Sequence, residues 1–156
     1  MEQTIKVARY RTAPYIVNFP FNGGHKTYSW SGSKGNKTDI KPLPQEVIDY
    51  LMMNSACFRL GELAIIEDTK EAKEVVENID EVEEYKNNTH SKEQVVKILE
   101  GNFMKMKSEL GKVTNKSEKK FFIDVAKEIQ LDSTSKQKFL AEWFGVKQDI
   151  LFADED

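Results

Sequence analysis

The chain has 156 residues, of which 39% are hydrophobic and 31% charged, the composition of a globular protein with one medium domain or two small ones. No apolar run approaches the roughly 20 residues of a transmembrane helix, and the N-terminus lacks the apolar core of a signal peptide, so we expect no membrane partner. The single cysteine, Cys57, excludes an intramolecular disulfide. Two histidines and one cysteine are too few for a structural zinc site, and we expect no cofactor.

The formal charge of −3 is distributed unevenly along the chain. Residues 1–66 hold eight basic and five acidic residues, residues 67–89 hold three and nine, and residues 90–156 hold twelve of each. The acidic middle block therefore marks a boundary in composition. We interpret residues 68–90 as an acidic, partly helical linker between two folded units.

Residues 1–14 are polar and carry Lys6, Arg9 and Arg11. We interpret this stretch as an extended arm, in which Ile5 and Val7 alternate with smaller or polar residues. Such an arm suits the addition of a strand to the sheet of a neighbouring protein. The alternative is a terminus without fixed structure.

Residues 15–67 have the pattern of a small β-rich, barrel-like module that contains one short helix. Two strands are expected on either side of a Gly23–Gly24 turn, over residues 15–21 and 25–30. A helix is expected from Pro44, because proline loses nothing in a first turn, and its apolar stripe is Val47, Ile48, Tyr50 and Leu51. A further strand is expected around Phe58, with Phe58 facing the core and Arg59 facing solvent.

Residues 91–147 have the pattern of a three-helix module. Ser91 and Gln94 form a capping box, and the apolar spacing after them predicts one helix that ends near Gly111. Thr114 or Asn115 caps the second helix, and Asp132 or Ser133 caps the third, which ends at Gly145. Residues 148–156 form an acidic tail. The fold class is therefore α+β: a β-rich module, an acidic linker and a helical module.

No combination of side chains in the sequence indicates catalysis. Cys57 lies among apolar neighbours and is interpreted as a buried, unreactive thiol. Neither His25 nor His90 has an acid or a cysteine nearby at triad or ligand spacing. We therefore expect that the protein is not an enzyme.

A lysine-rich stretch offers nucleic-acid binding as an alternative function. Six lysines fall within sixteen residues: Lys105, Lys107, Lys112, Lys116, Lys119 and Lys120. The stretch contains no arginine, and residues 90–156 are neutral overall, whereas nucleic-acid-binding domains are usually strongly basic. A solvated lysine surface is the preferred interpretation, and we do not expect a nucleic-acid partner.

The residues around the expected helix resemble a family. They are Ile40, Pro42 to Pro44, Glu46, Val47, Tyr50, Leu51, Phe58, Arg59, Gly61, Leu63 and Ile65. This pattern is similar to a small N-terminal domain in structural proteins of tailed bacteriophages and prophages. The resemblance covers residues 15–144. The chain departs from it in a longer N-terminal arm and a longer Gly/Ser/Lys loop.

The resemblance implies a non-enzymatic virion protein, located in the virion and, during assembly, in the host cytoplasm. It favours a capsid-associated accessory or decoration protein that binds the major capsid protein or neighbouring virion proteins, with a homo-oligomer as a further option. A head–tail connector or assembly factor is the alternative. We expect the partner-binding residues to be Lys6, Arg9, Arg11, Tyr28, Trp30 and Arg59.

Overall fold

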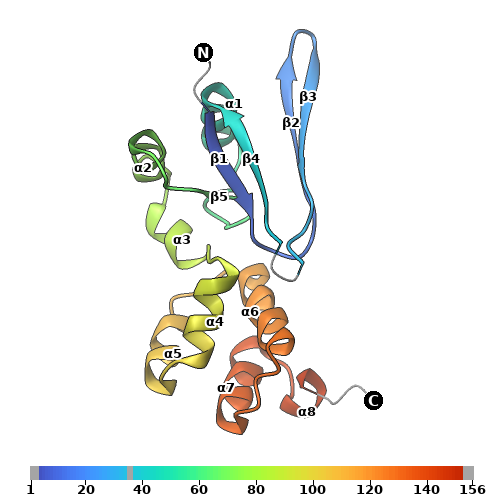
Figure 1. The fold of residues 1–156 in the computed structure, drawn as a ribbon, viewed down its shortest axis with the longest axis vertical. Helices are drawn as coiled ribbons and strands as arrows, with labels where there is room; N and C mark the ends of the chain where they lie inside the picture. Colours follow the sequence, from blue (N-terminus) through green and yellow to red (C-terminus); the bar gives the residue numbers. More distant parts are fainter. Residues whose placement is uncertain (1–3, 35–36, 153–156) are drawn as a thin grey trace. The chain divides into compact units, whose positions relative to one another are not determined.

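The computed structural model describes residues 4–34 and 37–152, which form two units, residues 1–89 and residues 90–156 (Figure 1). The first unit contains β1 (Thr4–Arg9), β2 (Tyr15–Phe21), β3 (Gly24–Trp30), β4 (Asp39–Pro44), α1 (Gln45–Asn54), β5 (Ala64–Ile65), α2 (Lys70–Glu77) and α3 (Val82–Asn87). The second contains α4 (Lys92–Glu100), α5 (Phe103–Leu110), α6 (Lys116–Glu128), α7 (Thr134–Phe144) and α8 (Gln148–Leu151). The α+β fold class is confirmed.

The centre of the first unit is β1, which pairs antiparallel with β4 on one side and with β5 on the other. Its Ile5, Val7 and Ala8 are buried, and Ile5 and Val7 belong to the same core cluster as Val47, Ile48 and Leu51 of α1. The interpretation of residues 1–14 as an extended arm is therefore wrong for residues 4–9. The alternation that suggested pairing with a neighbouring protein instead serves pairing within the fold. Residues 1–3 lie outside the described residues.

The strands β2 and β3 form a separate two-stranded hairpin, in register from Tyr15 with Trp30 to Phe21 with Gly24. Asn22 and Gly23 make the turn with φ of 47° and 79°, the left-handed conformation that matches the twist of a tight hairpin. The expected hairpin is confirmed. Because the two sheets are separate, the strands of the described residues form no closed barrel, and the barrel-like expectation is wrong.

Two elements between the hairpin and α2 differ from expectation. The pattern did not predict β4, since Pro42 and Pro44 lower strand propensity, but proline is tolerated here because β4 is an edge strand. The strand expected around Phe58 is reduced to Ala64–Ile65. Residues 57–61 are turns instead, and Gly61 has a φ of +76°. Phe58 is nevertheless buried and Arg59 is half-exposed.

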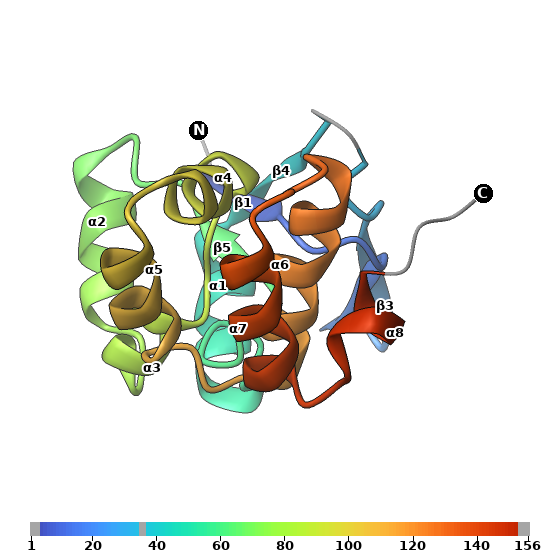
Figure 2. The ribbon, with the colours of Figure 1, turned by 90° about the horizontal axis from the view of Figure 1, so that it is seen from below.

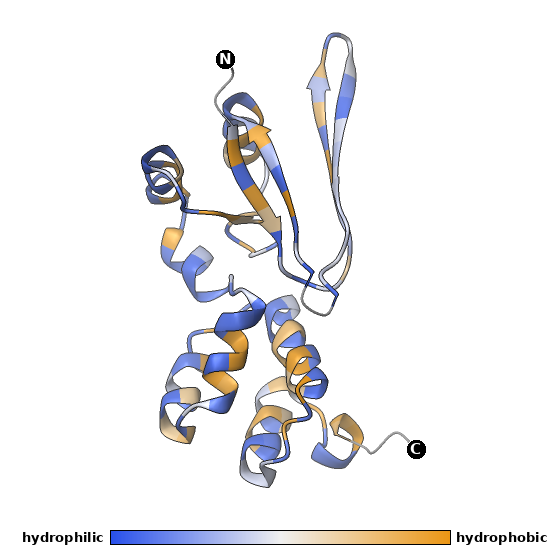
Figure 3. Cartoon of the chain, in the orientation of Figure 1, coloured by the Kyte–Doolittle hydropathy of each residue, from blue (hydrophilic) through white to orange (hydrophobic). Residues whose placement is uncertain are grey.

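The acidic segment belongs to the first unit and is not an open linker. Its apolar residues Ala72, Val75, Val76, Ile79 and Tyr85 are all part of the buried core. Figure 3 shows apolar residues along β1 and mainly hydrophilic residues over α2. The acids thus cover the solvent side of two helices whose few apolar anchors share one side. A charge count alone does not separate such a helix pair from a tether.

The second unit consists of short helices, among which α4 and α5 lie side by side (Figures 1 and 2). The capping box at Ser91 is confirmed, Asn115 and Ser133 cap α6 and α7, and Gly145 ends α7 with a φ of +87°. The single helix expected after Ser91 is divided at Gly101, because the Asn102 side chain caps a new helix, α5. The unit therefore has more helices than the three expected, and α8 lies in the expected acidic tail, of which residues 153–156 are not described.

None of the helices in the described ranges has the length and apolar character needed to cross a membrane.

We predict that Tyr85→Phe destabilises the first unit by about 1–3 kcal/mol, because the buried Ile65 N–H donates to the Tyr85 hydroxyl at 3.0 Å and would lose its acceptor. Urea unfolding followed by tryptophan fluorescence checks this in a Trp143→Phe background, where Trp30 is the remaining reporter. Tyr28→Phe is the control, since no hydroxyl hydrogen bond of Tyr28 occurs among the described residues. Equal stability of the two variants would contradict the packing of α3 on the sheet.

Candidate interaction site

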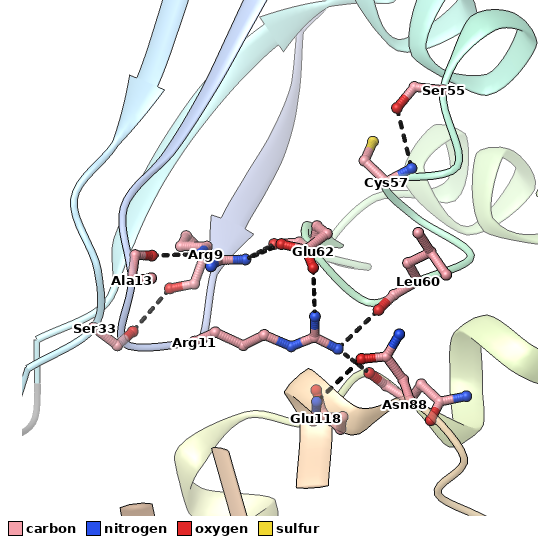
Figure 4. A network of polar contacts seen from close by, with 11 residues as sticks. Arg9, Arg11, Ala13, Ser33, Ser55, Cys57, Leu60, Glu62, Asn88 and Glu118 are labelled. Atoms are coloured by element: carbon pink, nitrogen blue, oxygen red, sulfur yellow. Dashed lines mark hydrogen bonds and ion pairs between the residues drawn. The ribbon is translucent and has the colours of Figure 1, made fainter. Parts of the chain in front are cut away.

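An ion-pair network joins two arginines to one carboxylate within the first unit (Figure 4). Arg9 ends β1, Arg11 follows it, and Glu62 lies in the turn before β5. Arg9 Nη1 is 2.9 Å from Glu62 Oε2, and Arg11 Nη1 is 2.8 Å from Glu62 Oε1. Both arginines are only 4% exposed, so the two carboxylate oxygens compensate guanidinium groups that water reaches poorly.

Backbone carbonyl groups complete the network. Arg9 Nε donates to Ala13 O at 2.8 Å, and Arg11 Nη2 donates to Leu60 O at 2.8 Å and Asn88 O at 3.2 Å. Gly61 is required beside them, because a Cβ there would lie 2.0 Å from Asn88 O. The network therefore fixes the loop after β1, the turn before β5 and the residue that ends α3.

The six residues expected to bind a partner do not form one surface. Arg9 and Arg11 are buried in the network, and Trp30 is 1% exposed with its indole N–H donating to Val7 O at 3.0 Å. These three side chains support the fold, which corrects their assignment. Their charge or aromaticity pointed to a partner, but each is satisfied internally.

The other three expected residues lie at least partly at the surface. Lys6 is exposed and pairs with Asp68 at 3.1 Å, Arg59 is 3.5 Å from Glu84, and Lys26 lies over the ring of half-buried Tyr28 at 5.6 Å. Their role in partner binding stays a prediction.

The outward face of the hairpin is a surface that the sequence-based residue choice missed. It consists of Ile16, Asn18, Pro20, His25, Thr27 and Ser29, all exposed, and is called the hairpin surface below. Ile16 is 61% exposed, and Thr27 Oγ1 donates to Asn18 Oδ1 at 2.9 Å beside it. Among the described residues, no third strand pairs with β2 or β3. The signal for this surface was the alternation in β2, in which every second residue faces away from the core.

The described residues contain no group of three His, Cys, Asp or Glu side chains placed to hold a metal ion. Burial raises the pKa of the Cys57 thiol to about 11, consistent with its interpretation as an unreactive core residue. In the second unit, His90 Nδ1 lies 3.3 Å from Glu118 Oε1, a pair that sequence distance concealed.

The lysine stretch of the second unit makes several contacts of its own. Lys107 lies over the Phe103 ring at 4.7 Å, and Lys119 lies over the Trp143 ring at 5.3 Å. Lys112 and Lys120 pair with acids at 3.6 Å and 3.1 Å. These contacts spread the lysine side chains over different neighbours and give them roles within the unit.

The fold and surfaces define a two-unit α+β protein. The family model of the YonA N-terminal domain matches residues 3–81, and that of the YonA C-terminal domain matches residues 91–150. The chain therefore belongs to the YonA family and is a phage- or prophage-type protein, which confirms the phage resemblance at this level. A search of curated proteins and a search of solved structures found no match.

We predict that Glu62→Gln destabilises the first unit by about 3 kcal/mol, because removing one partner leaves buried guanidinium charge uncompensated. Urea unfolding with Trp30 as the reporter measures the change. Glu84→Gln is the matched control at a surface pair and should change stability by at most about 1 kcal/mol. A Glu62→Gln variant as stable as this control would show that the network contributes little.

We predict that Cys57 reacts with a disulfide reagent at pH 8 at least about 100-fold more slowly in the folded protein than in guanidinium chloride. The raised pKa of about 11, against 9.0, lowers the thiolate fraction by about that factor, and burial restricts access further. The same shift makes the thiol's contribution to stability decline as pH rises from about 9 to 11, since the unfolded state loses its proton first. Similar rates in both states would contradict a buried Cys57.

Proposed function

We propose that the protein is a non-catalytic virion component, a capsid-associated accessory or decoration protein that binds the major capsid protein through its hairpin surface. The observation that carries the proposal is the hairpin itself. On its inner face Val17 and Trp30 are buried in the core, with Tyr15, Phe19 and Tyr28 half-buried against it, whereas its outer face is exposed along both strands. The family supports the phage context, since the N-terminal family model covers the hairpin.

The hairpin is suited to binding because it is held in place before a partner arrives. Its own Val17 and Trp30 are buried in the core, and the ring of its Phe19 packs edge-on against Tyr50 at 5.4 Å between centroids. A surface that is already ordered pays less conformational entropy on association than a flexible arm does. This gives the hairpin the role that the sequence pattern assigned to residues 1–14.

The chemistry of the hairpin surface suits a protein partner. Ile16 supplies exposed apolar area, and its neighbours Asn18 and Thr27 supply short polar groups without net charge. The outer edges of β2 and β3, which pair with no third strand of the described ranges, also suit the addition of a partner strand, with Pro20 limiting how far such pairing extends.

We predict that Ile16→Glu lowers binding to the particle at least about tenfold, because it places a charge in the apolar part of the contact. The assay is co-sedimentation of the tagged chain with particles of the encoding phage that lack the protein. Ile150→Glu is the matched control: the same exchange, at 65% exposure against 61%, in the second unit. Circular dichroism checks that both variants fold.

Equal binding by Ile16→Glu and Ile150→Glu would contradict the hairpin as the binding element. The number of copies per particle, measured by quantitative mass spectrometry, separates a decoration protein from a head–tail connector, because a decoration protein covers the shell. Binding to duplex DNA that falls steeply with salt would favour the nucleic-acid alternative instead.

A further inference from the structure

We infer that the second unit has a binding site of its own, a groove along α4 and α5 that takes an acidic amphipathic helix of a partner protein. The groove is lined entirely by residues of this unit and has a volume of about 500 Å³. It is separate from the hairpin surface, so the inference goes beyond the proposed function and does not depend on it.

The floor of the groove is apolar. Ile98 of α4 is half-buried and Met106 of α5 is buried, and both line the groove. Methionine is unbranched and polarisable, and it adapts its shape to different apolar side chains. The floor therefore offers an apolar partner residue a place that water fills poorly.

Two lysines line the groove, one from each helix. Lys97 of α4 and Lys105 of α5 both line it, both are exposed, and neither has an ion-pair partner within the described ranges. The acid in the lining, Glu109, is 3.6 Å from Lys112 and so is already paired. A segment with carboxylates on both sides of an apolar stripe complements this arrangement.

The dimensions favour a helix as the occupant. The nine residues of α4 span about 14 Å at 1.5 Å per residue, which matches two to three turns of a partner helix. A third helix packing between two neighbouring helices places its apolar residues at i, i+3, i+4 and i+7 on the floor. Nucleic acid would leave this apolar floor without a matching group.

The test uses the full chain and a defined probe, a fluorescein-labelled amphipathic peptide of about 14 residues with leucine at i, i+3, i+4 and i+7 and glutamate on both flanks. Fluorescence anisotropy measures its affinity. The double variant Lys97→Glu/Lys105→Glu should bind at least about tenfold more weakly, since two attractions become repulsions. The matched control is Lys127→Glu/Lys138→Glu, which alters the charge of the same unit equally at two exposed lysines outside the groove.

A second peptide, with lysine in place of each glutamate, gives the converse result. It should bind the Lys97→Glu/Lys105→Glu variant more tightly than the unaltered chain, which loss of folding does not produce. Ile98→Gln makes the floor polar. It should therefore weaken binding of the acidic peptide to the otherwise unaltered chain and binding of the lysine peptide to the Lys97→Glu/Lys105→Glu variant. The inference is overturned if the acidic peptide does not bind the unaltered chain, if both double variants lose affinity equally, or if duplex DNA binds the groove lysines more tightly than the peptide does.

Discussion

The first unit depends on one carboxylate that compensates two buried guanidinium groups. Arg9 at the end of the central strand and Arg11 two residues later both reach Glu62, and each contacts one of its carboxylate oxygens. Burying either charge without its partner is costly, so loss of Glu62 would leave both guanidinium groups uncompensated. Because β2 begins four residues after Arg11, the same network also fixes the start of the hairpin. Buried charge thus orients the surface that we propose binds a partner.

Several buried polar groups of the first unit have their hydrogen-bond partners inside the fold, whereas the two candidate binding surfaces keep most of theirs exposed. The arginines, Trp30 and the Tyr85 hydroxyl are satisfied within the first unit. The hairpin surface and the groove along α4 and α5 instead present apolar area with polar or charged edges. Surfaces of this kind suit association more than they suit chemistry. Membership of the YonA family makes the chain a phage- or prophage-type protein.

Local signals in the sequence predicted the elements that local chemistry determines. The hairpin turn was expected at Gly23–Gly24 and is found one residue earlier, at Asn22–Gly23. This turn, the helix after Pro44 and the caps at Ser91, Asn115 and Ser133 need only a few neighbouring residues. The charged residues were harder to place, because composition does not separate a buried, paired arginine from an exposed one. Arg9 and Arg11 were therefore assigned to an extended arm, because their partner Glu62 lies more than fifty residues away in the sequence. The acidic helices were taken for a linker for the same reason.

Hydrogen exchange of the full chain, free and bound to particles of the encoding phage, tests the proposed binding most directly. Binding through the hairpin surface predicts slower exchange in peptides that cover β2 and β3. It also predicts little change in β1, which is already protected at the centre of its sheet. Protection confined to other segments, with unchanged exchange throughout the hairpin, would contradict the account.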